Sequence, residues 1–504
     1  MKYIFSVIFL LFLFGNCLSQ QNTTINRVGN GYFINPILGG DYPDPTIMRE
    51  GDDYYMTHSA FDYVPGLTIF HSVDLINWKP ISSALTTYLG HGWAPDISKY
   101  GDKYYIYFTV WSKGNFVVYA DSPHGPWSTP VDLKVKHIDP CHVVDENGQR
   151  WLFLSSGNRV KLAEDGLSII PETLENVYKG WQYPKEWKVE GFHLEGPKIK
   201  KIREYYYYIS AQGGTAGPPT SHMAVVARSK SIDGPWENAL NNPLIHTYSA
   251  TEKWWSKGHG SLIDLPDSSL WMVYHAYEKN YSGLGRQTML EPVFKTDDGW
   301  LKAPTGAAVD KPINVPIKQG KPYNRYENLN QFRIGLDWKY YKKYDPSRAS
   351  FKNGVLTIKA QNNTLHESAP LMFVAGVHSY EFSVKIDIDT AVTAGLVLFY
   401  NDKAYIGIGF DRKNIYNWTD GEKRKIDTQE SGKCVWLKIR NIEQIVMVKY
   451  SWNGKSWIEV DLAKDVADFN HNNLRDFQSL LPGIFAYGSG EVRFSKFTFR
   501  KLNK

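Results

Sequence analysis

A unit made of a polar turn, an aromatic pair and an apolar strand recurs five times along the first part of the chain. The residues that open its aromatic part are Tyr54, Tyr104, Trp151, Tyr205 and Trp271. The copies are therefore 50, 47, 54 and 66 residues apart. Short strands repeated with a period near 50 residues are typical of β-propeller blades. We predict a five-bladed β-propeller over residues 32–310, with few helices.

Turn residues followed by a tryptophan come after the strands in three of the copies. These tryptophans are Trp78, Trp127 and Trp236. A turn followed by a large aromatic residue fits the end of the outer hairpin of a blade. We expect the three side chains to belong to the core of the propeller rather than to a sugar-binding surface.

The pattern changes after the fifth copy. Residues 311–330 contain three prolines and no strand pattern, which is typical of a linker. From residue 331 alternating strands return without the blade signature, as in residues 354–359 and 394–400, and turns such as Asn-Gly separate them. We predict an antiparallel β-sandwich of the jelly-roll type over residues 331–504, so the whole chain is all-β.

The amino terminus has the pattern of a signal peptide. A charged start is followed by an apolar run from Ile4 to Phe14 and by small residues up to a cleavage position after Ser19. The run is shorter than the roughly 20 residues that span a bilayer. We predict that residues 1–19 are removed and that the protein is exported, to the periplasm or the extracellular space, without a membrane span. Lipidation at Cys17 is the less favoured alternative, because the residues before it make a poor lipobox.

Composition narrows the class of function. The chain of 504 residues carries 57 Lys and Arg against 52 Asp and Glu without any basic run, so we expect no nucleic-acid partner. Aromatic residues make up 15% of the chain, and their flat rings suit the apolar faces of sugars. After signal cleavage only Cys141 and Cys434 remain, in different predicted domains. Neither a disulfide framework nor a structural zinc site is therefore expected.

One ionisable side chain lies a similar distance before the aromatic pair in every copy. The five are Asp44, Asp96, Asp139, Glu195 and His259, which precede the aromatic residue by 8 to 12 positions. In a propeller the first strand of each blade lines the central channel. Equivalent positions on five such strands would point five side chains at one axis. We therefore predict a ring of mostly acidic groups in one depression.

Crowded carboxylates suit the hydrolysis of a glycosidic bond. Neighbouring, partly buried carboxyl groups raise one another's pKa, which leaves one protonated acid and one ionised base at neutral pH. A single Asp-Pro is usually only a turn. Asp44-Pro45, Asp139-Pro140 and Glu195-Gly196-Pro197, however, fall in register with the repeat. Cys141 offers a nucleophile nearby, but a buried inert thiol is the better interpretation.

The order and spacing of these motifs resemble glycoside hydrolase family 43. The matching segments are Asn35–Leu38, Tyr42–Pro45, Trp93–Pro95, Ile138–Pro140, Glu195–Pro197, Gly258–Gly260 and Leu284–Arg286. The C-terminal part is similar to the concanavalin-like sandwich that follows many β-xylosidases of that family. The resemblance implies a five-bladed propeller and an inverting mechanism.

The resemblance also implies a role for each site residue. Asp44 would be the general base that activates water, Glu195 the general acid, and Asp139 the residue that tunes the pKa of the acid and orients it. The substrate-binding residues would be Phe61, Trp93, Asp96, His259 and Arg286. No cofactor is implied for the chemistry, although the resemblance leaves room for a structural calcium ion at the propeller axis, contacted indirectly by His259.

The chain departs from the family pattern at two positions. Lys198 follows the Glu-Gly-Pro motif where many xylosidases have a histidine. Asp96 follows the Trp-Ala-Pro motif as in the arabinan-acting branch, whereas many xylosidases carry an uncharged residue there. An insertion from Trp181 to His193, just before the acid, could shape a leaving-group site. These features leave the identity of the sugar open.

We therefore expect an exo-acting glycosidase that releases terminal α-L-arabinofuranosyl or β-D-xylosyl units from oligosaccharides or polysaccharides of the plant cell wall. Two alternatives stay open: a hydrolase of the same family that acts on arabinan or other pectin side chains, and a non-catalytic sugar-binding propeller. A retaining fructan-active enzyme is disfavoured, because the sequence lacks its Asn-Asp-Pro and Glu-Cys motifs. The sandwich is either a carbohydrate-binding module or a brace beside the pocket, and the oligomeric state is open.

Overall fold

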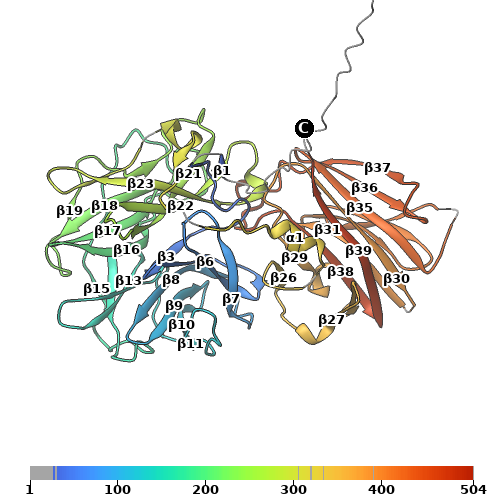
Figure 1. The fold of residues 1–504 in the computed structure, drawn as a ribbon, viewed down its shortest axis with the longest axis horizontal. Helices are drawn as coiled ribbons and strands as arrows, with labels where there is room; N and C mark the ends of the chain where they lie inside the picture. Colours follow the sequence, from blue (N-terminus) through green and yellow to red (C-terminus); the bar gives the residue numbers. More distant parts are fainter. Residues whose placement is uncertain are drawn as a thin grey trace, which may run out of the picture.

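The computed structural model describes residues 27–28, 31–304, 306–317, 320–332, 334–389, 391–428 and 430–502. The predicted signal peptide, residues 1–19, and Cys17 lie outside this part of the chain. Figure 1 shows two bodies side by side, the first built from the blue-to-yellow part of the chain and the second from the orange and red part. Almost all of their regular structure is β-strand.

Five antiparallel sheets form the first body. The first contains β3 (Thr46–Glu50), β4 (Asp53–Thr57), β6 (Gly66–Ser72) and β7 (Lys79–Leu85). The second contains β8 (Gly92–Tyr100), β9 (Lys103–Val110), β10 (Gly114–Ala120) and β11 (Val131–Asp132). The third contains β12 (Cys141–Val144), β13 (Arg150–Leu154), β14 (Asn158–Lys161) and β15 (Glu175–Asn176).

The last two sheets complete the propeller. The fourth contains β16 (Glu195–Ile202), β17 (Tyr205–Gln212), β18 (Met223–Ser229), β19 (Glu237–Asn238) and β20 (Ile245–His246). The fifth contains β21 (Trp254–Asp264), β22 (Leu270–Glu278), β23 (Gln287–Lys295) and β24 (Leu301–Lys302). The predicted five-bladed propeller is confirmed.

The aromatic pairs of the repeat lie on the second strand of each blade. Four of the leading residues, Tyr54, Tyr104, Trp151 and Trp271, are buried. Each blade is covered by a neighbour on both faces, so its second strand contributes large side chains to two cores. Trp78 is buried in one of these cores, and Trp127 and Trp236 are partly buried against two others.

The first strands of the blades close a ring around the propeller axis. Contacts connect β3 to β8, β8 to β12, β12 to β16, β16 to β21, and β21 back to β3. The residues at the start of these strands therefore surround one end of the central channel, although they are far apart in the sequence.

Two stacked antiparallel sheets form the second body. The eight-stranded sheet contains, in order, β34 (Glu422–Ile426), β33 (Ile415–Thr419), β32 (Tyr405–Phe410), β31 (Ala391–Phe399), β38 (Leu481–Ser489), β29 (Leu371–Phe373), β26 (Trp338–Tyr341) and β5 (Tyr63–Val64). The seven-stranded sheet contains β27 (Ala349–Lys352), β28 (Val355–Lys359), β39 (Glu491–Lys501), β30 (Tyr380–Ile388), β35 (Cys434–Ile442), β36 (Ile445–Ser451) and β37 (Ile458–Asp465). The predicted sandwich is confirmed.

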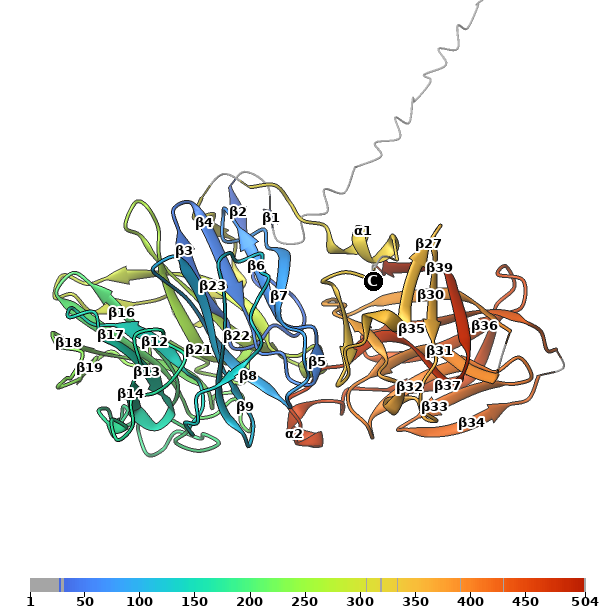
Figure 2. The same ribbon diagram turned by 90° about the horizontal axis from the view of Figure 1, so that it is seen from below.

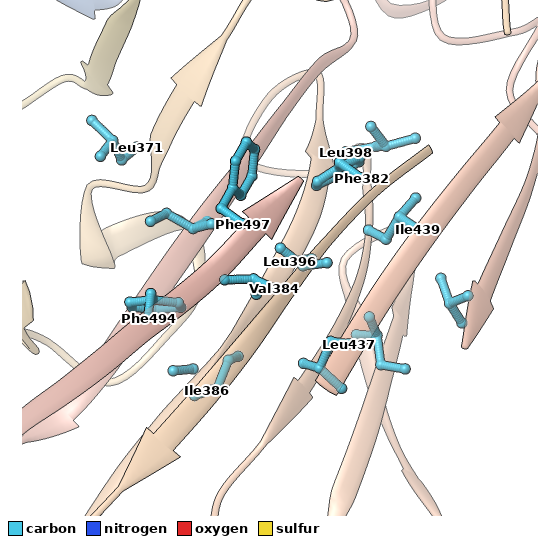
Figure 3. Close-up of a cluster of buried hydrophobic side chains, with 14 of the residues drawn as sticks. Leu371, Phe382, Val384, Ile386, Leu396, Leu398, Leu437, Ile439, Phe494 and Phe497 are labelled. Atoms are coloured by element: carbon cyan, nitrogen blue, oxygen red, sulfur yellow. The ribbon is translucent and has the colours of Figure 1, made fainter. Parts of the chain in front are cut away.

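Alternating side chains form the core of the sandwich. Along β30, every second residue is buried, so one face of the strand points inward. Figure 3 shows Phe382, Val384 and Ile386 of this strand among leucines and phenylalanines of both sheets. The period of two that predicted these strands from the sequence is therefore the pattern that fills the space between the sheets.

The two bodies share a sheet. Strand β5 belongs to the first blade in sequence, but it pairs with β26 at the edge of the sandwich. The segment 311–330, predicted as a linker, contains β25 (Ile313–Asn314) and helix α1 (Arg325–Asn330). Strand β25 pairs with β2 (Tyr32–Phe33), which also pairs with β1 (Arg27–Val28), and α1 packs on β39. The connection is thus held against both bodies.

Helical structure is sparse. Helix α2 (His471–Leu474) is seen in Figure 2 between the two bodies. Short 3₁₀ turns span Ser155–Gly157, Ser282–Leu284, Gly306–Asp310, Pro346–Arg348 and His366–Ser368. Within the described ranges, none of the helices has the length and apolarity needed to cross a membrane.

The shared sheet predicts that the propeller depends on the sandwich. A chain that ends at Lys321 would leave the β5 edge unpaired and expose Tyr63, which is buried against Tyr341 (ring centroids 5.8 Å apart). Because unpaired edges and exposed apolar surface promote aggregation, we expect this chain to melt at a lower temperature and to aggregate. Calorimetry and light scattering measure both. A truncated chain that melts cooperatively at the Tm of the full-length chain would contradict the prediction.

Candidate active site

Most of the predicted site residues line one hollow at the axis of the propeller. Its lining comprises Asp44, Phe61, Trp93, Ala94, Ile138, Asp139, Glu195, Thr215, His259, Arg286 and Phe477. Seven of the eight site residues predicted from the sequence are in this set, and Asp96 is not. The three carboxylic acids come from three blades, so the hollow is a product of the ring of first strands.

A backbone feature positions the ring. One residue in or just before each first strand has a positive φ: Asp44 (55°), Ala94 (35°), Asp139 (59°), Gly196 (55°) and His259 (54°), the last in the middle of β21. A proline follows the first four of these residues, and a glycine follows the fifth. Left-handed backbone at non-glycine residues is strained and concentrates at functional sites. The repeated conformation turns the chain at these positions so that side chains reach the hollow.

A second layer of side chains lies beneath this ring. Its members are two residues further along each chain segment: Thr46, Asp96, Cys141, Lys198 and Ser261. All five are buried. Residues two apart in a strand share a face and are about 7 Å apart along it, so this layer lies deeper in the channel than the carboxylates of the hollow.

Asp96 belongs to the second layer, which corrects its predicted place in the acidic ring. The ring position in its blade is taken by Ala94, and β8 has a register shift between Trp93 and Asp96 where it pairs with β9. Asp96 precedes its aromatic residue by only 8 positions, whereas Asp44 and Glu195 precede theirs by 10, so Ala94 is the residue with the equivalent spacing. Asp96 forms an ion pair with Lys198 instead of facing the hollow.

Asp44 is a buried carboxylate that is held ionised. Arg286 Nη1 lies 2.9 Å from its Oδ1, and the Ser59 hydroxyl donates to its Oδ2. Burial by itself would raise the pKa of Asp44, but the Arg286 guanidinium, together with His259 and His275, outweighs burial, and the pKa lies well below the usual value. Asp44 is therefore a carboxylate at neutral pH.

Two neutral histidines complete the surroundings of Asp44. The backbone N–H of Asp44 donates to His275 Nδ1 at 3.1 Å, and His275 Nε2 is 3.3 Å from Thr215 Oγ1. His259 Nδ1 is 3.4 Å from Asp44 Oδ1. Burial lowers the pKa of His275 to about 4 and that of His259 to about 3. Both rings are therefore neutral near pH 7, and at that pH Arg286 provides the positive charge beside Asp44.

Asp139 and Glu195 form a pair with the opposite behaviour. Burial, followed by the charge on Asp44, raises the pKa of Asp139 to about 7, although the Gly196 N–H donates to its Oδ2 at 2.9 Å. Burial, followed by the charges on Asp139 and Asp44, raises the pKa of Glu195 well above its usual value. Near neutral pH the pair holds a proton, and Glu195 is the member that binds it more tightly.

Phe477, which the sequence analysis missed, reaches the hollow from the sandwich. Its ring centroid is 6.4 Å from that of Phe61, with the planes nearly parallel, and 6.0 Å from that of Trp93. The Arg286 guanidinium carbon lies 5.1 Å from the Phe477 centroid. No sequence motif marks Phe477, because it comes from a polar loop of the other domain. Thr215, Ala94 and Ile138 were also missed.

The loop that carries Phe477 is attached to the propeller. Asn472 accepts a hydrogen bond from the Gly217 N–H at 2.9 Å and donates one to the Gly217 carbonyl at 3.1 Å. The Leu480 N–H donates to the Gly283 carbonyl at 2.8 Å. These contacts on both sides of Phe477 hold its ring over the hollow, so the sandwich forms part of the wall.

The insertion before Glu195 lies beside the hollow without lining it. Trp187 stacks on His246 with centroids 4.7 Å apart, and the Trp181 N–H donates to Gln212. Neither residue is in the described lining of the hollow. Trp111, in contrast, is 56% exposed and stacks on Trp93 at 4.5 Å. The aromatic surface therefore continues from the hollow to the solvent on the Trp93 side.

Sequence comparison identifies the family. The model described as "Glycosyl hydrolases family 43" matches residues 33–301, and "Beta xylosidase C-terminal Concanavalin A-like domain" matches residues 328–500. The chain belongs to glycoside hydrolase family 43. It is thus a glycoside hydrolase of a family that inverts the anomeric centre.

Relatives match this family 43 chain along almost its whole length. A non-reducing end α-L-arabinofuranosidase of Bacteroides ovatus is 31% identical, over 94% of this chain and 95% of its own. A β-xylosidase of Bacillus subtilis is 25% identical, over 88% and 93%. A crystal structure of a family 43 protein of Bacillus licheniformis superimposes with a TM-score of 0.83 at 27% identity, over 94% of this chain and all of its own.

The contacts of Phe477 predict that the sandwich contributes to turnover. We expect Phe477→Ala to lower kcat/KM on the order of tenfold, since the loss of one aromatic contact in a closed pocket is of this size, with little change in Tm. Phe351→Ala is the matched control, because Phe351 is an exposed aromatic residue of the same domain. Equal kcat/KM for the two variants would contradict the prediction and show that Phe477 does not contribute to turnover.

Proposed function

We propose that this family 43 enzyme removes terminal α-L-arabinofuranosyl or β-D-xylosyl units from oligosaccharide fragments of plant cell-wall polysaccharides. The observation that carries the proposal is the single hollow in which one ionised carboxylate faces two acids that share a proton. The names of the relatives from Bacteroides ovatus and Bacillus subtilis support the two sugars. The two sugars present similar hydroxyl patterns, so one pocket suits both.

The protonation states assign the roles. Asp44, ionised by its contact with Arg286, acts as the general base that takes a proton from water. Glu195, protonated near neutral pH, donates its proton to the leaving oxygen. Asp139 accepts the Gly196 N–H, next to Glu195 in the chain, so it orients the acid and raises its pKa. The attacking water adds to the anomeric carbon as the glycosidic bond breaks, which inverts the configuration.

The walls of the hollow suit the end of a sugar chain. Phe61, Trp93 and Phe477 offer flat apolar faces, and Arg286 offers guanidinium N–H groups to sugar hydroxyls. The contacts of the Phe477 loop with Gly217 and Gly283 close one side, which favours a terminal unit over an internal one. Asp96, the residue that pointed to the arabinan-acting branch, is withdrawn into the ion pair beneath the hollow.

Export of the enzyme is part of the proposal. The charged start and apolar run of residues 1–19 support secretion through a cleaved signal peptide, to the periplasm or outside the cell.

Substitution of the two proposed catalytic acids tests the roles. We expect Asp44→Asn and Glu195→Gln each to lower kcat on oligosaccharides by about 10²-fold or more, as loss of acid or base catalysis does. With an aryl glycoside of low leaving-group pKa, Glu195→Gln should regain most of the loss, because that leaving group needs no proton, whereas Asp44→Asn should not. Asp264→Asn, at the far end of β21, is the control. Near-normal turnover by both variants would refute the assignment.

The pKa shifts predict an asymmetric pH profile. Activity should fall as pH rises through the titration of the Asp139–Glu195 pair, because Glu195 then loses the proton that it donates. On the acid side activity should persist well below the ordinary range of a carboxylate, because Arg286 keeps Asp44 ionised. Measurement of kcat/KM against pH checks both limbs. An acid limb near pH 6 in a protein that is still folded would contradict the state assigned to Asp44.

A further inference from the structure

Asp96 and Lys198, the two residues that depart from the family pattern, are paired with each other. Lys198 Nζ lies 2.7 Å from Asp96 Oδ1 and 3.1 Å from the Pro95 carbonyl. The side chains of Lys198 and Asp96 are 9% and 8% exposed. A buried charge is stable only with a partner of opposite charge, so each of the two residues accounts for the presence of the other.

The pair spans the axis of the propeller. Asp96 is on β8 of the second blade and Lys198 on β16 of the fourth, and these strands are not neighbours in the ring. The Asp96 carboxylate also accepts the hydroxyl of Thr46 in the first blade at 3.3 Å and the N–H of His142 in the third at 2.9 Å. One carboxylate therefore ties four first strands together directly beneath the hollow.

The charge of Lys198 acts on the groups above it. Burial is the main cause that raises the pKa of Asp139, and Lys198 opposes that rise. Burial likewise lowers the pKa of His259, and Lys198 adds to the lowering. The ionisable groups that act on the Asp139–Glu195 pair are Asp44, Glu190, Lys198 and Arg286. His259 lines the same hollow. Lys198 is the cation that approaches the pair from below.

The donors at the axis do not fit the calcium ion for which the family resemblance left room. Calcium takes six to eight oxygen ligands. Here Asp44 is already bound by Arg286 and Asp96 by Lys198, and His259 approaches Asp44. Among the described residues, no three His, Cys, Asp or Glu side chains are grouped as a metal site. A divalent ion in this layer would also be repelled by the Lys198 ammonium.

We propose that Lys198, paired with Asp96, is the resident cation of the propeller axis: it supplies the positive charge beneath Asp139 and Glu195, and the enzyme needs no divalent metal ion there. Lys198 is a positioning residue, since it acts on the sugar only through the acid pair. The proposal builds on the acid and base roles given above, whereas its metal-free character depends on the Lys198–Asp96 geometry alone.

Metal content and thermal melting test the metal-free axis whatever the substrate is. Full-length protein purified without added metal is analysed for calcium by elemental mass spectrometry, and its Tm and activity are measured with a chelator and with added calcium chloride. We expect calcium far below one ion per chain, and the same Tm and kcat in both conditions. One calcium ion per chain, or a Tm that falls with chelator and returns with calcium, would overturn the proposal.

Charge changes in the pair test its action on the acids. Lys198→Met removes a positive charge, so the Asp139–Glu195 pair keeps its proton to higher pH and the alkaline limb of kcat/KM moves up by about one pH unit. Asp96→Asn leaves the Lys198 charge unbalanced and moves the limb down. The double variant Asp96→Asn/Lys198→Met should return the limb towards its original position. The double variant leaves no unpaired buried charge. We therefore expect it to fold even if a single variant does not, and the position of its limb can still be measured.

A purely structural role predicts a different result. In that case both single variants would have a lower Tm and lower activity. The alkaline limb of kcat/KM would stay in place, or it would move in the same direction for both variants. That outcome would overturn the proposal. Lys257→Met is the matched control, since it breaks another buried ion pair of the propeller, with Glu252 at 2.8 Å, and should leave the limb unmoved. Failure of the proposed function would appear separately, as near-normal turnover by both Asp44→Asn and Glu195→Gln.

Discussion

The ion pair between Asp44 and Arg286 is the interaction on which the chemistry of this hollow depends. It places a negative charge where burial alone would have removed it. That charge, close to Asp139 and Glu195, helps to keep a proton on the other two acids. A base and an acid therefore coexist at one pH, although both are buried carboxyl groups, because only one of them has a guanidinium partner.

The architecture brings these groups together in layers. A left-handed residue in or just before each first strand belongs to the layer that faces the hollow, and the residues two positions further on form the layer beneath it. The layer beneath is held by the Asp96–Lys198 pair, which joins two blades that are not neighbours in the ring. The sandwich adds the last wall through Phe477, and the shared strand pair β5–β26 fixes how it docks. The hollow is therefore built by the backbone of the first strands, by the buried ion pair beneath them and by the docking of the sandwich.

Much of this could be predicted from the sequence, and the exceptions have physical causes. The repeat predicted the blades because each blade buries the same aromatic strand, and the acid-proline motifs predicted Asp44, Asp139 and Glu195. Asp96 was placed one layer too high, because its spacing of 8 residues was taken as equivalent to the 10 residues of Asp44 and Glu195, a spacing that belongs to Ala94. Phe477 had no local signal, because only the docking of two domains brings it to the hollow.

The distribution of protons over the three acids is the most direct test. Difference infrared spectra near pH 6 distinguish a protonated carboxylic acid from a carboxylate by its carbonyl band. If Glu195 holds the proton, the spectrum of the wild-type protein minus that of Glu195→Gln contains a protonated-acid band, and the corresponding difference for Asp44→Asn contains a carboxylate band instead. A protonated-acid band in the Asp44 difference, or none in the Glu195 difference, would contradict the assignment of base and acid.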